Sequence, residues 1–364
     1  ITKRKIPAYL GSSFAFISPV LLLYGQGYDF QTIQGGFVLV GVVFSIIAII
    51  VGYIGIGWIN KLFPPAAMGS IITLIGLELA GTAADMAGFP VGGSNSPTLN
   101  VSWVIVSMVT LLTVILCNVL LRGFLKVIPL LIGVIVGYIT SYFMGIVDFS
   151  LVSNASFFVL PNIKIAHFNI NAILTILPAT FVVIAEHVGH LKVTSSIVGK
   201  DFLEDPGLHR SLLGDGLSTI VSGMFGSVPT TTYGENIGVM ALTKIYSVYI
   251  ICGAGLISII LGFSGKMSAL IRTIPTPVIG GVSFLLFGTI AVSGLRTFIE
   301  EKVDFSKSRN LILSSVIFIV GISGITLTMG SFEITGMGLA TIVAIILNLS
   351  FIIFDKLGLM NEKE

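Results

Sequence analysis

The stretch "GSVPTTTYGENIG", residues 226–238, interrupts an otherwise apolar region with a proline, three threonines and three glycines. Unpaired backbone N–H and C=O groups are costly in lipid, so irregular backbone at membrane depth must be enclosed by protein or line a cavity. The β-branched and aromatic residues favour a short extended piece. A second stretch, "PAYLGSSFAFISP" (7–19), has the same character. The sequence therefore predicts two broken segments at the midplane of a membrane protein.

An internal repeat relates these two segments. "FPPAAMGSIITLIGLELAG" (63–81) resembles "IPTPVIGGVSFLLFGTIAVSG" (274–294), and the two pairs have similar offsets along the chain. An odd number of intervening spans makes the two copies run in opposite directions, as in inverted-repeat transporters. The second copy has two spans (170–226) before its broken segment and the first copy has none. We therefore expect a 7+7 inverted-repeat parent of fourteen spans, N-terminally truncated here to about twelve.

The composition predicts an all-α polytopic membrane protein. Of the 364 residues, 54% are hydrophobic and 10% charged, and the mean hydropathy is +1.04. Soluble domains carry about 25% charged residues, and several apolar blocks approach the roughly 20 residues that a helix needs to cross a bilayer. The predicted membrane segments are 6–24, 36–56, 64–84, 102–122, 127–147, 170–190, 210–226, 228–243, 245–263, 275–295, 310–325 and 335–355.

The distribution of positive charge orients these segments. With "TKRK" (2–5) in the cytoplasm, the cytoplasmic loops receive all lysines and arginines except Lys164, Lys266 and Arg272, out of a total of 19. This asymmetry is the one that membrane insertion favours, and it places the C-terminus in the cytoplasm. The net charge of +2 and the lack of a long basic run give no indication of a nucleic-acid partner.

The stretch "FVVIAEHVGH" (181–190) places titratable groups in an apolar segment, where such groups are usually functional. Glu186 and His190 are four residues apart and share a helix face, whereas His187 points elsewhere and suits packing or the helix end. Glu235 lies in the second broken segment. Two buried carboxylates beside free backbone groups suit a small, flat, neutral ligand with N–H donors and carbonyl acceptors.

Other residues leave alternatives open. Phe14 and Tyr233 could stack on such a ligand or serve as packing aromatics. The Glu186/His190 pair could be a satisfied buried ion pair, or two residues at the wet cytoplasmic end of the helix, since Lys192 follows. Asp85 and Asp215 lie near span ends and could be wet, and Glu78 is either a structural carboxylate or a gate residue. The order "EHVGH" differs from the H-E-x-x-H of zinc proteases, and no G-x-S-x-G or P-loop occurs, so we expect neither an enzyme nor a metal or cofactor.

The stretch "TTYGENIGVMALTK" (231–244) resembles the signature [QEP]-N-x-G-x-x-x-x-T-[RKG] of the nucleobase–cation symporter-2 (nucleobase–ascorbate transporter) family. Glu235, Asn236, Gly238, Thr243 and Lys244 occupy the signature positions. Purine and ascorbate branches usually carry Gln at the position of Glu235, and "AEHVGH" is typical of the bacterial uracil branch. The resemblance covers essentially the whole chain and includes "DPGLHRSLLGDGLST" (205–219).

The resemblance implies a core domain and a gate domain. The core would comprise residues 1–60 and 168–272, and the gate residues 61–167 and 273–364, with homodimers formed through the gate. The expected site lies between the two broken segments, where Glu186 and Glu235 would bind the edges of uracil. Backbone amides at Phe14 and Gly234 would bind its carbonyls, and Tyr233 would line the site.

In this reading His190 holds Glu186 and joins both carboxylates in proton coupling, and the protein imports uracil across the bacterial cytoplasmic membrane with a proton. The family's first helix, which also contacts substrate, is absent from this chain. The alternatives are a xanthine or uric acid permease of the same family, an anion exchanger or channel of the same general fold, and a membrane enzyme with a Glu/His site.

Overall fold

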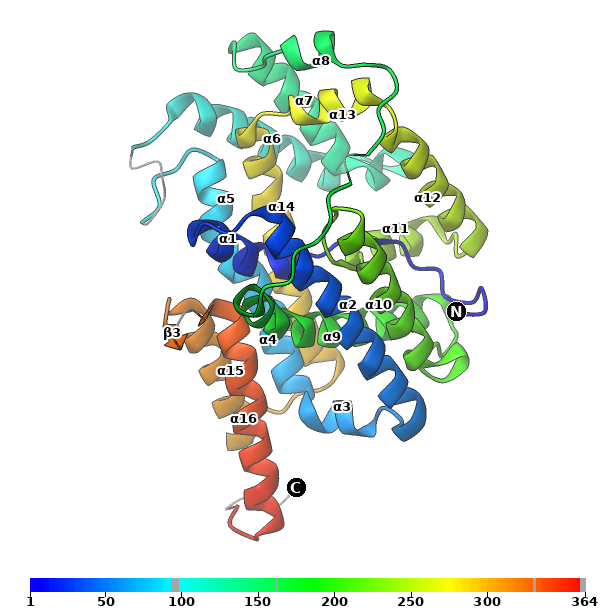
Figure 1. Ribbon diagram of the computed structural model, residues 1–364, viewed down its shortest axis with the longest axis vertical. Helices are drawn as coiled ribbons and strands as arrows, with labels where there is room; N and C mark the ends of the chain where they lie inside the picture. Colours follow the sequence, from blue (N-terminus) through cyan, green and yellow to red (C-terminus); the bar gives the residue numbers. More distant parts are fainter. Residues whose placement is uncertain (93–97, 162, 330–331, 361–364) are drawn as a thin grey trace. The chain divides into compact units, whose positions relative to one another are not determined.

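The computed structural model describes residues 1–92, 98–161, 163–329 and 332–360, most of them in helices (Figure 1). Each of the twelve predicted segments coincides with a helix, or with a strand followed by a helix. Residues 361–364 of the predicted cytoplasmic tail lie outside the described residues. The α-helices are α1 (Ile17–Gly25), α2 (Phe30–Ile54), α3 (Gly57–Leu62), α4 (Pro65–Glu78), α5 (Ala80–Met86), α6 (Val101–Leu120), α7 (Pro129–Phe143), α8 (Ser150–Asn154), α9 (Ile170–Val198), α10 (Leu208–Met224), α11 (Gly234–Thr243), α12 (Val248–Gly262), α13 (Gly265–Arg272), α14 (Thr276–Glu300), α15 (Ser308–Ile322) and α16 (Gly336–Lys356).

Helix length separates the membrane segments into two classes. Within the described part of the chain, six stretches are long and apolar enough to cross a bilayer: α2, α4 together with α5, α6, α9, α14 and α16. Four shorter apolar helical stretches accompany them, at 14–25 and in α7, α12 and α15. Short spans are expected where a helix is interrupted at membrane depth and its backbone is satisfied by neighbouring protein.

The other elements are short. Two 3₁₀-helices, η1 (Phe14–Phe16) and η2 (Gly123–Val127), and one π-helical turn, η3 (Leu203–Gly207), join longer helices. Among the described residues, two antiparallel strand pairs occur: β1 (Leu10–Ser12) with β2 (Thr230–Thr232), and β3 (Thr326–Met329) with β4 (Phe332–Thr335). The extended pieces predicted in the broken segments are β1 and β2, whereas the β3–β4 hairpin is not predicted by the sequence.

The chain divides into two compact units, of which the first comprises Ile1–Glu78, Asn162–Ile251 and Ala291–Glu364. In this unit α2 packs along α10 (Figure 1). Gly41 of α2 has no room for a side chain, since a Cβ there would lie 2.7 Å from the Gly216 carbonyl oxygen of α10. Small residues allow such close approach of two membrane helices. The α9 helix is buried along most of its length, with α2, α4, α10 and α16 among its neighbours.

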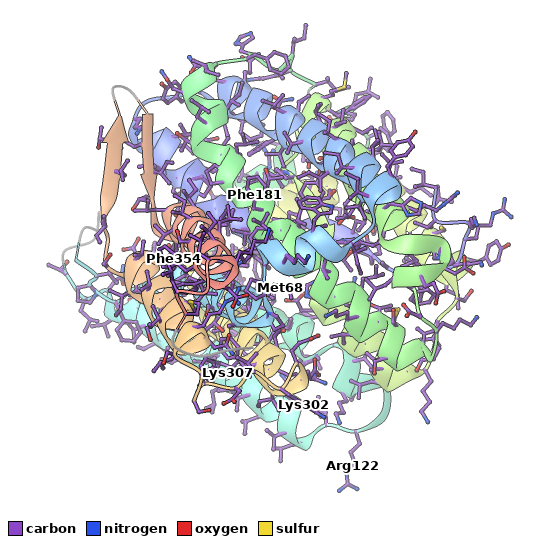
Figure 2. All side chains as sticks on the ribbon, turned by 90° about the horizontal axis from the view of Figure 1, so that it is seen from below. Met68, Arg122, Phe181, Lys302, Lys307 and Phe354 are labelled. Carbon is purple, nitrogen blue, oxygen red and sulfur yellow. The ribbon has the colours of Figure 1, made fainter. Side chains whose placement is uncertain are left out.

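Helices α4, α15 and α16 form a second packed group within the first unit. Ser314 of α15 donates its hydroxyl to the Ala66 carbonyl of α4 at 3.3 Å. Met68 of α4 is buried in this group, whereas Lys302 and Lys307, in the connection before α15, are exposed at its edge (Figure 2). The group therefore has an apolar interior and a charged end, as expected of a membrane bundle.

The second unit comprises Leu79–Pro161 and Cys252–Ile290. Gly133 and Gly137 of α7 lie directly against side chains of α6, with no space for a Cβ. The Tyr138 hydroxyl lies 2.7 Å from the Thr273 hydroxyl, which fixes α7 to the end of α13. The predicted core and gate boundaries are not the boundaries of these two units. Core and gate are defined by relative movement and the units by static contacts, so the core and gate division stays a prediction.

Candidate functional site

The two broken segments meet as an antiparallel pair of three-residue strands. Leu10 of β1 is paired with Thr232 of β2, and Ser12 with Thr230. Two further backbone bonds extend the pairing at each end: Ser13 N–H donates to the Pro229 carbonyl at 3.0 Å, and Tyr233 N–H to the Tyr9 carbonyl at 3.1 Å. The strands therefore satisfy each other's backbone groups, as the interior of a membrane protein requires.

A helix begins directly after each strand. Phe14 opens η1, which continues into α1, and Gly234 opens α11. Because the strands are antiparallel, the two helices leave the pair in opposite directions, with their N-terminal turns at opposite ends of it. The first N–H groups of a helix lack intrahelical partners and carry a partial positive charge. The N-terminal turns of two helices therefore border the strand pair.

Tyr233 lies across the first strand. Its hydroxyl is 2.9 Å from the Ser12 hydroxyl, and its ring rests on Gly11, where a Cβ would overlap the ring. A glycine at position 11 is thus required for Tyr233 to take this place. Phe14 is half-buried in η1, and the neighbouring Phe16 anchors η1 through an edge-on contact with Phe37 of α2, with ring centroids 6.3 Å apart.

Glu186 and His190 lie on the face of α9 that meets the second broken segment. A Cβ on Gly234 would lie 3.0 Å from His190 Nε2, so the imidazole lies against the first turn of α11. The ring is also within hydrogen-bonding reach of the Thr232 backbone. His190 Nδ1 is buried and has no hydrogen-bond partner among the described residues. This histidine therefore links α9 to the strand–helix junction.

Three carboxylates converge beside this junction. Glu186 interacts electrostatically with Glu235 in the first turn of α11 and with Asp215 of α10. Glu186 and Glu235 are half-buried, and Asp215 is 1% exposed. The structure thus brings together the two glutamates that the sequence analysis selects, beside Gly234, Tyr233 and His190. Phe14 lies beyond the opposite end of the strand pair.

Asp215 and His187 form a buried pair that the sequence analysis did not predict. Nδ1 of His187 lies 2.7 Å from Oδ2 of Asp215, with both side chains 2% exposed. Nε2 of the same ring lies 2.8 Å from the Ser211 hydroxyl. The alternative of a wet Asp215 is wrong, because the residue lies against His187 of α9 and is 1% exposed. The sequence signal for this buried cluster is the four-residue spacing of Ser211 and Asp215, which places both side chains on one face of a helix.

Among the described residues, no group of three or more His, Cys, Asp or Glu side chains is placed to hold a metal ion. The polar groups at the junction are carboxylates, an imidazole, hydroxyls and helix N-termini. Such a set can accept hydrogen bonds from a planar polar ligand and donate hydrogen bonds to it, and it can exchange protons.

Known proteins with similar sequences are membrane permeases. A uracil permease of Paenibacillus larvae is 55% identical over 363 residues, which is 100% of this chain and 86% of that protein. A uracil permease of Escherichia coli K12 is 56% identical over 351 residues, covering 96% of this chain and 81% of the relative. A putative pyrimidine permease, RutG, of the same organism is 40% identical and covers 96% of this chain and 79% of the relative.

Two solved structures share the fold at low sequence identity. SLC26A9 superposes with a TM-score of 0.67 at 12% identity, over 97% of this chain and 58% of that protein. The transmembrane domain of the cyanobacterial bicarbonate transporter BicA gives a TM-score of 0.61 at 14% identity, over 95% of this chain and 84% of that domain. The predicted 7+7 inverted-repeat fold is thereby confirmed.

The model of the permease family matches residues 1–330. This match and the full-length relatives agree with the resemblance drawn from the signature at 231–244, and they identify a transport protein rather than an enzyme. Several apolar helices are long enough to cross a bilayer, which makes the protein a multi-pass one. The chain belongs to the permease family.

Proposed function

We propose that this protein imports uracil together with a proton, by alternating access. The observation that carries the proposal is the convergence of Glu186 from α9 and Glu235 from α11 beside the N-terminal turn of α11. The names of the relatives, uracil permeases at 55–56% identity, support the choice of ligand.

Uracil is planar and neutral, and it offers two N–H donors and two carbonyl acceptors. The carboxylates of Glu186 and Glu235 accept its N–H groups, and the backbone N–H groups at Phe14 and Gly234 donate to its carbonyls. Tyr233 lines the site. Since Phe14 and Gly234 begin two different helices, the ligand is held between the two broken segments.

The proton belongs to the same group of side chains. Glu186 is repelled by Glu235 and by Asp215 when all three are ionised, so a proton taken up by Glu186 relieves that repulsion. A protonated group no longer repels electron-rich carbonyl oxygens, which favours binding from outside. His190 holds Glu186 in place and exchanges the proton, and loss of the proton to the cytoplasm accompanies release of uracil.

The wider arrangement follows the family resemblance. A core (1–60 and 168–272) moves relative to a gate (61–167 and 273–364), and the gate forms a homodimer. The protein lies in the bacterial cytoplasmic membrane, surrounded by lipid, with its C-terminus in the cytoplasm. The proton is the coupling ion, and no other cofactor takes part.

Uptake of labelled uracil by proteoliposomes containing the full-length protein tests the proposal. We expect uptake driven by an inward proton gradient, and at least a tenfold loss in E235A and in E186Q. Glu204, an exposed glutamate in the turn η3, provides the matched control, and E204Q should transport normally. Uptake that ignores the gradient would refute proton symport, and full activity of E235A would refute the assigned site.

Competition decides between ligand classes. The runner-up is a purine permease. For such a protein, a low concentration of xanthine or uric acid would abolish the uptake of labelled uracil. An anion exchanger of the same fold would carry bicarbonate or chloride currents instead. The converging carboxylates support a neutral ligand over an anion, because an anion would be repelled by them. We expect uracil alone among these compounds to compete strongly.

A further inference from the structure

The short helix α1 follows the first broken segment, and few of its side chains are buried against the rest of the protein. Of its nine residues, Leu23 is the fully buried one, and Leu21 and Tyr24 are 51% and 47% exposed. Hydrophobic contacts alone therefore fix α1 weakly. Because η1 and α1 are continuous, any displacement of α1 also displaces Phe14.

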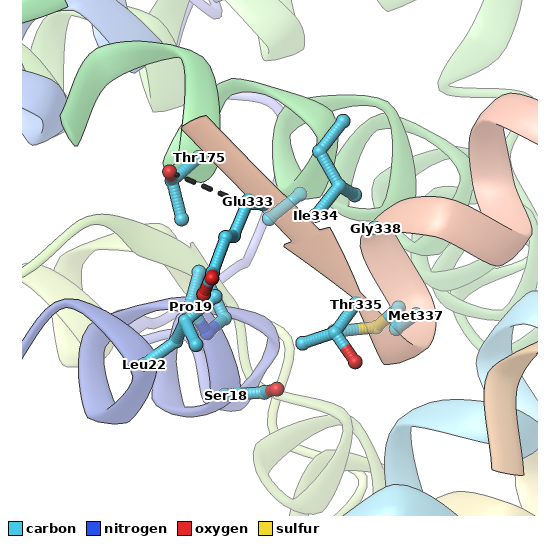
Figure 3. Close-up of a pocket in the computed structure, with 10 residues that line it drawn as sticks. Ser18, Pro19, Leu22, Thr175, Glu333, Ile334, Thr335, Met337 and Gly338 are labelled. Carbon is cyan, nitrogen blue, oxygen red and sulfur yellow. Dashed lines mark hydrogen bonds between the residues drawn. The ribbon is translucent and has the colours of Figure 1, made fainter. Parts of the chain in front are cut away.

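Polar contacts hold α1 at both ends. Near its start, the Ser18 hydroxyl donates to Oε1 of Glu78, the last residue of α4, at 2.6 Å. Just past its end, the Gln26 amide donates to Oε2 of Glu333 in β4 at 2.7 Å. A small cavity of about 10 Å³ separates α1 from β4 and α16 between these points (Figure 3). A cavity of this size holds at most about one water molecule.

Glu78 also binds a third element. Its Oε2 accepts the backbone N–H of Met337, in the first turn of α16, at 3.0 Å. Thr335 precedes this helix and makes no side-chain capping bond, so the carboxylate of Glu78 acts as the cap in its place. Gly336 has φ +55° and leaves no space for a Cβ beside the Glu78 carboxylate. One half-buried carboxylate thus joins α1, α4 and α16.

We propose that Glu78 is a positioning residue for the ligand site: by binding Ser18 it fixes α1, and through α1 the backbone N–H at Phe14. Ser18 lies one helical turn after Phe14, so the tether acts close to the donor it positions. This proposal rests on the proposed function for the identity of the ligand. The contact itself is independent of that identity.

Substitutions at position 78 separate hydrogen bonding from charge. Gln is isosteric with Glu: its carbonyl can accept from Met337 N–H, and its NH₂ can donate to the Ser18 hydroxyl, which accepts as well as donates. Ala removes both contacts. We expect E78A to raise the Kd and KM for uracil three- to tenfold. Because Glu78 lies in the proposed gate and Ser18 in the proposed core, their contact must open during transport, so the maximal uptake rate should not fall. E78Q should keep the wild-type Kd and KM for uracil.

The partner residue and a control complete the design. S18A should weaken binding as E78A does, and the double variant S18A/E78A should bind no more weakly than E78A, since each change removes the same hydrogen bond between Ser18 and Glu78. S314A provides the matched control, because Ser314 bonds α15 to α4 without touching α1, and it should leave Kd unchanged. Additive losses, or an equal loss in S314A, would overturn the proposal.

Hydrogen exchange gives a second measurement that needs no ligand. Peptides spanning residues 10–25 should exchange faster in E78A than in the wild type and at the wild-type rate in E78Q. If the wild-type protein binds no uracil but E78A shows this local increase, the proposed function fails while the tether stands. If uracil binds and neither exchange nor Kd changes in E78A, the tether fails while the proposed function stands.

Discussion

Nδ1 of His187 lies 2.7 Å from Oδ2 of Asp215, in a pair with both side chains 2% exposed. The contact joins α9, which carries Glu186 and His190, to α10, and the Ser211 hydroxyl closes its other side at 2.8 Å. His187 lies on the face of α9 next to the one that bears Glu186 and His190. Its contact with Asp215 therefore holds this part of α9 in position.

Removal of the Asp215 carboxylate should destabilise the protein. D215A leaves the His187 imidazole buried without its partner, and breaking a buried pair costs about 3–5 kcal/mol. D215N keeps the shape of the side chain and one oxygen that can accept a hydrogen bond, so it should lose less stability than D215A. Thermal unfolding in detergent measures both variants, and a D215A protein that melts at the wild-type temperature would contradict the prediction.

A side chain at position 11 should displace Tyr233. In G11A the new methyl group overlaps the Tyr233 ring, so the ring must move and its contact with the Ser12 hydroxyl is lost. We expect at least a tenfold weaker affinity for uracil, measured by equilibrium binding. Gly214 of α10 has open space around its Cα, and G214A should bind normally and gain up to about 1 kcal/mol of stability. Equal affinity in G11A and the wild type would exclude the close packing of this ring.

The ion pair between Lys5 and Asp205 predicts that stability depends on pH and on salt. The hydrogen bond from Lys5, supported by the nearby Lys3 and Arg210, lowers the pKa of Asp205 below its ordinary value of 3.8. A lowered folded-state pKa contributes stability above the unfolded-state pKa, and that stability is lost as the pH falls through the folded-state value.

D205N should therefore melt below the wild type at pH 7. The difference should shrink as the pH is lowered beneath about 3.8, and also in about 1 M salt, where exposed charges are screened. Asp355, an exposed aspartate near the end of α16, supplies the control, and D355N should show no such pattern. A difference between D205N and the wild type that is unchanged by salt would argue against the ion pair.

Asn348 of α16 is buried, and its side chain binds the backbone at the end of helix α3. It is 0% exposed, and its amide donates to the Lys61 and Leu62 carbonyls at 2.7 and 3.1 Å. N348A leaves those carbonyls without this donor and should cost about 1–3 kcal/mol in unfolding free energy. Ser350, half-buried on the same helix and bonded within it, is the control, and S350A should melt normally.

The sequence predicts what periodicity and punctuation encode. The twelve segments match helices because apolar blocks of span length have few alternatives in lipid. The two broken segments contain short strands as predicted, since proline, glycine and threonine mark backbone that cannot continue as helix, whereas the pairing of these strands is not predicted. Glu186 and Glu235 can be selected because an ionisable residue in an apolar run is conspicuous.

Contacts between distant segments are less accessible to sequence reasoning. The burial of Asp215 depends on its contact with His187, which lies on a different helix, α9. Glu78 lies at a helix end, where sequence alone leaves a structural and a gating role equally open. Its bonds to Ser18 and Met337 depend on segments about 60 and 260 residues away.

The strand pairing also has a consequence for biogenesis. Leu10 is partnered by Thr232, so β1 is synthesised about 220 residues before the strand that completes it. At about 5–20 residues per second, the ribosome needs on the order of 10–40 s to deliver β2. During that interval the N–H and C=O groups of β1 lack their native partners at membrane depth. The strand pair is therefore completed only once residue 232 of the 364 has been made, and a chain terminated before residue 230 inserts helices without ever forming it.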